Sequence, residues 1–285
     1  MLARHGGPDQ YSIRRQHNDS VTEPASGDEL HIMSFNLRYA STRTPNSWAQ
    51  RRPVMAELLR RERPTVLGTQ EGLRDQLADL DRDLPDHDWI GAGRAGGGQD
   101  EFVAVFYDTH RVRPMEFDHF WLSDTPHAVG SRSWGNVVIR MVTWVRFTDL
   151  RTGTEFVTVN THFDHKSAHS RRRSAELVCD WLNGLAPGVP AVLTGDFNAP
   201  AGASAAYDVL VTGAALTDTW TAAAERLSPP YATFHGYHGL VPSGDRIDWI
   251  LTRGARVRAA GVNTFSRDGQ YPSDHLPVQA LITFG

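Results

Sequence analysis

One octapeptide, LTGDFNAP at residues 193–200, constrains the fold more than any other stretch of the sequence. The apolar residues that lead into it, from Ala191 onward, are typical of the end of a buried strand. Gly195 then allows the backbone to turn, and Pro200 cannot continue a strand ladder. The stretch therefore predicts a strand that delivers Asp196 and Asn198 to the edge of a sheet.

The pair Asp196 and Asn198 has two interpretations. Residues i and i+2 of an extended chain share a face, so both side chains would address the same ligand. A carboxylate beside a carboxamide suits the orientation of water and the binding of a phosphate oxygen or a hard metal ion. The structural alternative is an Asx turn that closes the strand. The octapeptide alone leaves both interpretations open.

Length and composition indicate an ordinary globular protein. The chain has 285 residues, of which 40% are hydrophobic and 22% charged, and this length fits one large domain or two small ones. Residues 1–29 are polar with little periodicity, so we expect a disordered tail. No linker or compositional break divides residues 30–285, which predicts a single domain there.

Charge and special residues narrow the function classes. The formal net charge is -4, which gives no general attraction to nucleic acid. The one cysteine, Cys179, excludes an internal disulfide framework and lies in a helical pattern, so we expect it to pack in a core. No apolar run has the length of a membrane span, and no secretory signal is evident. We therefore expect a cytoplasmic monomer that does not bind membranes.

The apolar periodicity predicts about a dozen strands and four or five helices. Helices are expected over residues 48–63, 73–84 and 167–185, with a short one over 207–211, and one long strand over 137–147. The Gly-rich residues 91–98 predict a flexible loop, which lacks the Lys-Ser/Thr of a P-loop. Because hairpins and helical crossovers are mixed, we predict two mixed β-sheets packed face to face with helices outside.

Polar side chains gather where the predicted strands end or begin. These positions are Asn36, Glu71, His162, Asp164, Asp196, Asn198, Asp248, Asp274 and His275. So many carboxylates in one cleft would repel one another unless cations neutralise them, which favours a hard divalent ion such as Mg²⁺ or Mn²⁺. No Ser or Cys nucleophile stands beside a base, so the predicted nucleophile is activated water.

Six ordered stretches carry a resemblance to a known superfamily: SFNLRY, GTQEG, NTHFDH, LTGDFNAP, RIDWIL and PSDHLPV. Together they resemble the endonuclease/exonuclease/phosphatase superfamily over residues 31–285. The segments FWLSDTP, SRSWGN, HFDH and TFHGY are similar to a bacterial branch of it. The resemblance implies an α/β four-layer sandwich, in agreement with the two sheets predicted above.

The resemblance also implies a role for each candidate. Metal binding would fall to Glu71, with Asn36 beside it and Asp274 near the ion. Asp196 would orient or deprotonate the attacking water, Asn198 and His162 would hold phosphate oxygens, and His275, polarised by Asp248, would stabilise the phosphoryl group. Arg140 would contact phosphate. The other candidate substrate-binding residues come from the matching stretches and are Arg38, Asp164 and His235.

The predicted activity is metal-dependent hydrolysis of a phosphate mono- or diester by in-line attack of water. The acidic balance favours a phosphorylated small molecule or a nucleotide-like compound as substrate. A nuclease acting on DNA or RNA is the main alternative. Two remote ones are a zinc metallohydrolase, because residues 162–165 read His-Phe-Asp-His, and a non-catalytic binding module of the same fold.

Overall fold

The computed structural model describes residues 25–285, so residues 1–24 of the predicted tail lie outside the described residues. The remaining residues of that tail, 25–29, form a turn. Ser26 donates from its backbone N and its Oγ to Oε2 of Glu29, at 3.1 and 3.0 Å. Glu29 is buried and ion-paired with Arg258, which ties the start of the described chain to a strand.

The first sheet contains both parallel and antiparallel pairs. Its spatial order is β10 (Glu225–Arg226), β12 (Ala255–Val262), β13 (Val278–Phe284), β1 (Leu30–Asn36), β2 (Val66–Gly72), β4 (Phe102–Asp108) and β3 (His87–Gly93). β1 is parallel to β2 and antiparallel to β13. The carboxyl ends of β1 and β2 therefore meet the loop that enters β13 at one edge of the sheet.

The second sheet is also mixed. Its spatial order is β5 (Val112–Trp121), β6 (Met141–Asp149), β7 (Glu155–His162), β8 (Ala191–Asp196), β11 (Asp248–Arg253) and β9 (Thr217–Asp218). β7 is parallel to β8, with His162 opposite Asp196. β11 is antiparallel to β8 and begins with Asp248 opposite Asp196. The register of these strands therefore places His162, Asp196 and Asp248 side by side at the same end of the sheet.

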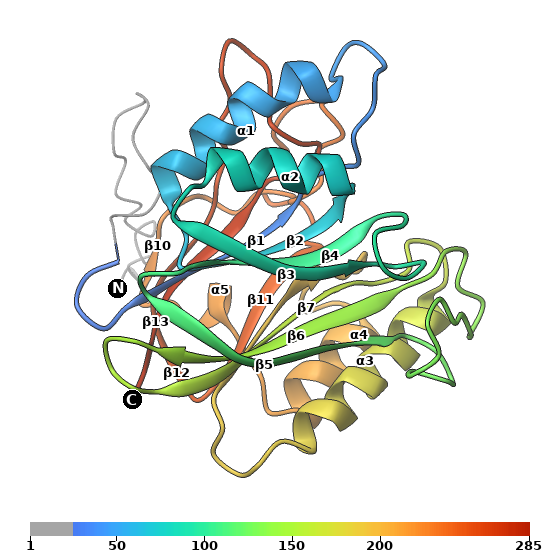
Figure 1. Cartoon of the computed structure of the whole chain (residues 1–285), viewed down its shortest axis with the longest axis vertical. Helices are drawn as coiled ribbons and strands as arrows, with labels where there is room; N and C mark the ends of the chain where they lie inside the picture. Colours follow the sequence, from blue (N-terminus) through green and yellow to red (C-terminus); the bar gives the residue numbers. More distant parts are fainter. Residues whose placement is uncertain (1–24) are drawn as a thin grey trace, which may run out of the picture.

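Helices cover the outer face of each sheet (Figure 1). α1 (Trp48–Glu62) and α2 (Arg74–Asp83) lie on the first sheet, and α3 (Ala168–Asn183) and α4 (Ala205–Asp208) lie on the second. A π-helical turn (Val209–Gly213) follows α4, and α5 (Thr219–Ala222) is a single turn near β11. The order helix, sheet, sheet, helix confirms the predicted four-layer α/β sandwich.

Alternation along β1 shows why the layers form. Ile32 belongs to the apolar core between the two sheets, with Val145, Val192 and Ile282. The next residue, Met33, belongs to a separate core under α1 and α2. Successive side chains of a strand point to opposite faces, so a strand buried on both faces must be apolar at nearly every position. All seven residues of β1 are buried.

Most of the predicted elements are confirmed, and two need correction. The first three residues of the predicted loop over residues 91–98 are the end of β3, paired with β4. The strand predicted over residues 137–147 begins only at Met141, because Val137 donates its backbone N to the Asp164 side chain instead of to a strand neighbour. Cys179 packs in the core under α3, as predicted.

None of the helices within residues 25–285 combines the length and the apolar character needed to cross a membrane.

Candidate active site

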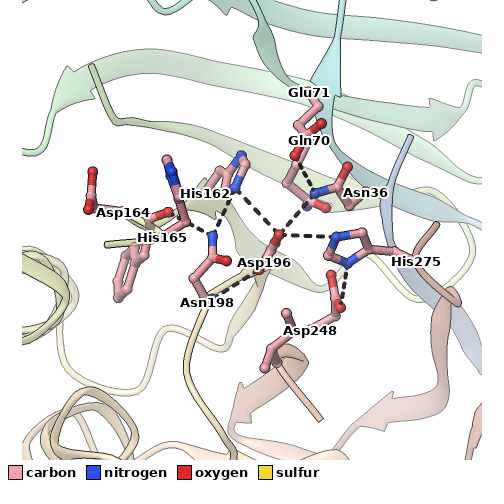
Figure 2. A network of polar contacts seen from close by, with 12 residues as sticks. Asn36, Gln70, Glu71, His162, Asp164, His165, Asp196, Asn198, Asp248 and His275 are labelled. Carbon is pink, nitrogen blue, oxygen red and sulfur yellow. Dashed lines mark hydrogen bonds and ion pairs between the residues drawn. The ribbon is translucent and has the colours of Figure 1, made fainter. Parts of the chain in front are cut away.

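The two sheets present their polar strand ends at the same edge of the sandwich. Asn36 and Glu71 come from the ends of β1 and β2, and His162 and Asp196 come from the ends of β7 and β8. The start of β11 adds Asp248, and the loop before β13 adds Asp274 and His275. Figure 2 shows these side chains converging around Asp196. The structure therefore brings together most of the residues predicted from the sequence.

Asp196 uses its two carboxylate oxygens differently. Oδ1 accepts a hydrogen bond from the backbone N of Asn198 at 2.9 Å, which closes the turn after β8. Oδ2 accepts from Nδ2 of Asn36 at 2.9 Å and lies 3.4 Å from Nε2 of His162 and 3.8 Å from Nε2 of His275. Oδ1 therefore closes the Asx turn of the structural interpretation, and Oδ2 faces the other polar side chains of the cluster.

The environment of Asp196 makes its carboxylate more basic than an ordinary aspartate. Its side chain is 1% exposed. Burial and then the negative charge of Asp248 raise the pKa of Asp196, while His275 and the hydrogen bonds from Asn198 and Asn36 oppose the rise. A carboxylate whose pKa is shifted toward neutrality is suited to accept a proton from water.

His275 and Asp248 form a buried pair next to Asp196. Nδ1 of His275 lies 3.0 Å from Oδ2 of Asp248. Burial alone would lower the pKa of His275, but the carboxylates of Asp248 and Asp196 outweigh it and raise that pKa to about 10. His275 is therefore an imidazolium at neutral pH, a fixed positive charge at the centre of the cluster.

His162 has the opposite electrostatic environment. Burial, together with the positive charges of Arg140 and His275, lowers its pKa well below the ordinary value, so its ring is neutral. Its Nε2 lies 3.1 Å from Nδ2 of Asn198, and the same Nδ2 donates to the backbone O of Phe163 at 3.0 Å. Asn198 adopts a left-handed backbone with φ of 49°, which its short polar side chain tolerates. His162 and Asn198 therefore lie together on the β7 side of the site.

Glu71 and Asp274 are the acidic groups on the other side of the cluster. Oε1 of Glu71 accepts from Nδ2 of Asn36 at 3.1 Å, and Oδ1 of Asn36 accepts from the backbone N of Arg38 at 2.9 Å. Burial raises the pKa of Asp274, and the negative charge of Glu71 adds to that rise, against the positive charges of His275 and Arg38. Asn36 thus contacts the predicted metal ligand Glu71 as a donor.

Two groups of side chains within residues 25–285 have the proximity that a metal ion requires. Potential ligand atoms lie within 4.8 Å of one another in the group Glu71, His162 and Asp196, and in the group Asp196, Asp248 and His275. His275 is cationic, which makes the second group a poor cation site. The first group is rich in oxygen and holds a neutral imidazole, which fits a hard or borderline divalent cation.

Arg38 lies at the rim of the site, on the Asp274 side. Its Nε is 3.6 Å from Oδ2 of Asp274, and its guanidinium stands 4.9 Å from the centre of the Tyr237 ring. A quarter of the side chain is exposed, at 25%. This position leaves donors of Arg38 accessible to a substrate.

Asp164 and His235 are turned to other partners. Asp164 accepts from the backbone N of Lys166, Ser167 and Val137, each at 2.8 Å, and these bonds lower its pKa against the effect of burial. His235 is buried, its ring lies 4.5 Å from the Tyr271 ring in a tilted arrangement, and its backbone N donates to the Asp274 carbonyl. This geometry favours a supporting role for both.

Arg51 supports the site from α1, and the sequence analysis missed it. Its side chain is fully buried, at 0% exposed. The guanidinium donates to five backbone carbonyls, those of Leu37, Arg38, Tyr39, Asn46 and Pro272, at 2.8 to 3.2 Å. It thus links the loop after β1 to the loop that carries Asp274. Nothing in the sequence distinguished Arg51 from the other arginines of this helix.

A polar network between the sheets lies beneath the cluster and was also missed. Nε2 of Gln70 donates to Oδ1 of Asn160 at 2.8 Å, and Nδ2 of Asn160 donates to the carbonyls of Thr69 and Ala104. Thr194 Oγ1 donates to the same Asn160 oxygen at 3.1 Å. These bonds join β2, β4, β7 and β8 directly behind Glu71 and Asp196.

Residues 33–275 match the Endonuclease/Exonuclease/phosphatase family. The chain belongs to this family. The resemblance drawn from the six sequence stretches is thereby confirmed, and the polar strand ends of the sandwich occupy the region that the match covers. No curated protein matches the chain.

Several solved structures are similar to this chain over nearly the whole fold. The endonuclease/exonuclease/phosphatase from Bacteroides vulgatus is 31% identical, with a TM-score of 0.85, covering 90% of this chain and 99% of that one. A mannosyl-6-phosphatase from Bacteroides thetaiotaomicron is 33% identical, with a TM-score of 0.82, covering 90% and 100%. TDP2 from D. rerio, complexed with a single-strand DNA product, shares only the fold, at 16% identity and a TM-score of 0.68 over 90% and 100%.

Proposed function

We propose that this family member is a divalent-metal-dependent phosphoesterase that hydrolyses a small phosphorylated molecule by in-line attack of water. One observation carries the proposal. Oδ2 of Asp196 stands between a neutral histidine, His162, and a cationic one, His275, with Asn36 donating to it at 2.9 Å. A buried base beside a fixed positive charge is suited to phosphoryl transfer to water, which depends on positioning and on stabilisation of negative charge.

Asp196 is the proposed base. Its raised pKa allows the carboxylate to take a proton from water, while the turn bond from Asn198 N fixes its orientation. His162 and Asn198 would hold phosphoryl oxygens from the β7 side. His275, kept cationic by Asp248, would stabilise the negative charge that develops on the phosphoryl oxygens.

Glu71 and Asp274 are the proposed metal ligands, with Asn36 beside them. The charge of Glu71 helps to raise the pKa of Asp274, a repulsion between carboxylates that a bound cation would relieve. A Mg²⁺ or Mn²⁺ ion held by these residues would supply positive charge next to the oxygens of the scissile phosphoryl group. His162 is the further candidate ligand, since its ring nitrogen belongs to the same group as Glu71.

A small substrate fits better than a nucleic acid. The net charge of -4 gives no attraction to a polyanion. The mannosyl-6-phosphatase that is 33% identical and fully covered supports a phosphorylated small molecule, such as a sugar phosphate, as the substrate class. The zinc alternative loses support because neither candidate metal group within residues 25–285 includes Asp164 or His165.

The test is a phosphoester panel with the purified full-length chain, with Mg²⁺ or Mn²⁺ and with EDTA. We expect hydrolysis of small phosphate esters that stops in EDTA and returns when metal is added back. Glu71→Gln should lower both the rate and the metal affinity, measured by calorimetry, because it removes the charge and nearly keeps the shape. Full activity in EDTA would contradict the metal assignment, and hydrolysis of DNA or RNA alone would contradict the substrate class.

A further inference from the structure

A small pocket lies beside the Asp196 cluster and shares two of its residues, Glu71 and His162. Its other polar walls are Arg94, Glu101 and Arg140. Arg140 comes from the loop that enters β6, whereas Arg94 and Glu101 come from the connection between β3 and β4. The sequence analysis gave this Gly-rich connection little weight, yet the fold places it at the site.

Arg94 is held in a defined position. Its Nη1 and Nη2 donate to the two carboxylate oxygens of Glu101 at 2.6 and 3.1 Å, and Nη2 lies 3.0 Å from Asp100. Its backbone is also fixed, because its N donates to the Glu101 carbonyl and its O accepts from Nε1 of Trp121 at 2.7 Å. The side chain is 14% exposed. Such a bidentate pair fixes the plane of the guanidinium.

Arg140 faces the same pocket from the opposite sheet. The residue is 4% exposed, and its Nη2 lies 3.4 Å from Nδ1 of His165. The Nε atoms of both Arg94 and Arg140 are buried and have no hydrogen-bond partner within residues 25–285. A buried N–H donor without an acceptor is costly, so two of them on arginines that line one pocket point to an anionic ligand that completes the site.

The size of the pocket limits what that ligand can place in it. Its volume is ≈10 Å³, about the space of one water molecule. An oxygen atom of a phosphoryl group fits this space, whereas a second phosphate or an ester substituent does not. Two carboxylates, Glu71 and Glu101, also line the pocket, and Glu101 is paired with Arg94 through the bidentate bond.

We propose that Arg94 and Arg140 together bind a non-bridging oxygen of a phosphate monoester and thereby select monoesters over diesters. The inference rests on the proposed function and specifies its substrate class. A monoester carries close to two negative charges at neutral pH and three non-bridging oxygens, whereas a diester carries one charge and has a second substituent. The second arginine balances the additional charge of the monoester, which a diester lacks. Glu101 acts as the positioning residue for Arg94.

The experiment compares two esters with the same leaving group, nitrophenyl phosphate and bis(nitrophenyl) phosphate, in the presence of Mg²⁺. The wild-type chain should strongly prefer the monoester. Arg94→Gln should lower kcat/KM for the monoester by about 10-fold or more, the scale of one lost hydrogen bond to a charged group. The activity of Arg94→Gln toward the diester should change by less than about threefold, so its preference for the monoester should shrink. Arg94→Lys keeps the positive charge and should retain part of the wild-type preference.

Arg111→Gln is the matched control. Arg111 makes a similar bidentate bond to Asp149, at 3.1 and 2.8 Å, and is 12% exposed, but it lies outside the pocket. The Arg111→Gln variant should show the same preference for the monoester over the diester as the wild-type chain. Calorimetry with inorganic phosphate and Mg²⁺ gives a readout without turnover, in which Arg94→Gln should bind about 10-fold more weakly and Arg111→Gln normally.

The outcomes separate the two proposals. Equal losses toward both esters in Arg94→Gln, or a wild-type chain that hydrolyses the diester as well as the monoester, would overturn the selectivity inference and leave the phosphoesterase proposal standing. Unchanged phosphate binding in Arg94→Gln would overturn it as well. A wild-type chain that hydrolyses neither ester nor any other phosphoester would overturn the proposed function itself.

Discussion

Asp149 and Asp196 are both buried aspartates that end a strand of the second sheet, and they have opposite surroundings. Asp149 ends β6, Asp196 ends β8, and the two strands run so that these residues lie at opposite edges. Asp149 accepts two bonds from Arg111 and one from the backbone N of Arg151. Asp196 has no arginine on it within the described chain; its neighbours are an asparagine, two histidines and another aspartate.

The difference shows what separates a paired structural carboxylate from the proposed catalytic base at similar burial. The Arg111 guanidinium pairs with Asp149 and uses both of its carboxylate oxygens. Asp196 uses Oδ1 in its own turn, and its Oδ2 faces the site. Burial and the negative charge of Asp248 raise the pKa of Asp196. Glu176 on α3 is a third case, paired with Arg172 and Arg173 but 30% exposed, so solvent screens its charges.

The largest expected effect is on turnover in Asp196→Asn. The substitution keeps the volume and the turn but removes the charge that accepts a proton, so kcat should fall by about 10²-fold or more. Asp149→Asn is the control and should keep its turnover at 25 °C. Initial rates on a nitrophenyl monoester with Mg²⁺ measure both, and equal losses in the two variants would abolish the distinction between them.

The second effect concerns the pair formed by His275 and Asp248. His275→Ala and Asp248→Asn should each lower turnover, and the double variant should be little slower than His275→Ala alone, because the two residues act as one unit. In Asp248→Asn the pKa of His275 should fall from its raised value, so the alkaline limb of the pH–rate profile should move to lower pH. Multiplicative losses, or an unmoved alkaline limb, would show that the residues work independently.

The third effect is on stability at the opposite edge. Arg111→Gln or Asp149→Asn leaves one buried partner of an ion pair uncompensated, which should cost about 3 kcal/mol of unfolding free energy. Urea denaturation measures this cost, with turnover under native conditions as the control. A loss below about 0.5 kcal/mol would show that this pair adds no more than an exposed one.

The smallest effect is expected on α3. Glu176→Gln removes the partly exposed carboxylate that pairs with Arg172 and Arg173. We expect the unfolding free energy to change by less than about 0.5 kcal/mol and turnover to stay the same. The same denaturation series provides the measurement. A larger loss would mean that solvent screening at this position is weaker than the exposure of its side chains indicates.

The residues at the strand ends could be predicted from the sequence because the alternation of apolar residues along each strand sets how the strands pair. Asn36, His162, Asp196 and Asp248 each border an apolar run whose length and period define a strand, so their convergence needs only that the strands pair. The buried carboxylate Asp164 shows the limit of that argument. Its oxygens are occupied by three backbone amides from the two loops around it, and loop backbone direction is not encoded in apolar periodicity.

The pocket residues were missed for a related reason. Arg94 and Glu101 are charged residues in a Gly-rich segment, where charge normally means exposure. They reach the site because β3 extends through Gly93 and pairs with β4, which turns the connection over Glu71. Gly93 has no room for a side chain, since a Cβ there would lie 1.9 Å from the carbonyl O of Gln99. That constraint exists only once the two strands are paired.

Arg51 has a consequence for motion. One cation is bonded to carbonyls at both ends of the loop that joins β1 to α1 and to a carbonyl of the loop before His275, so the two loops cannot separate without breaking bonds to that cation. Local opening of a protein proceeds in cooperative units. Because Arg51 bonds to both Asn46 and Pro272, we expect the start of α1 and the Asp274 side of the site to open together. Backbone amides near Asn46 should then exchange with solvent as slowly as those next to Asp274.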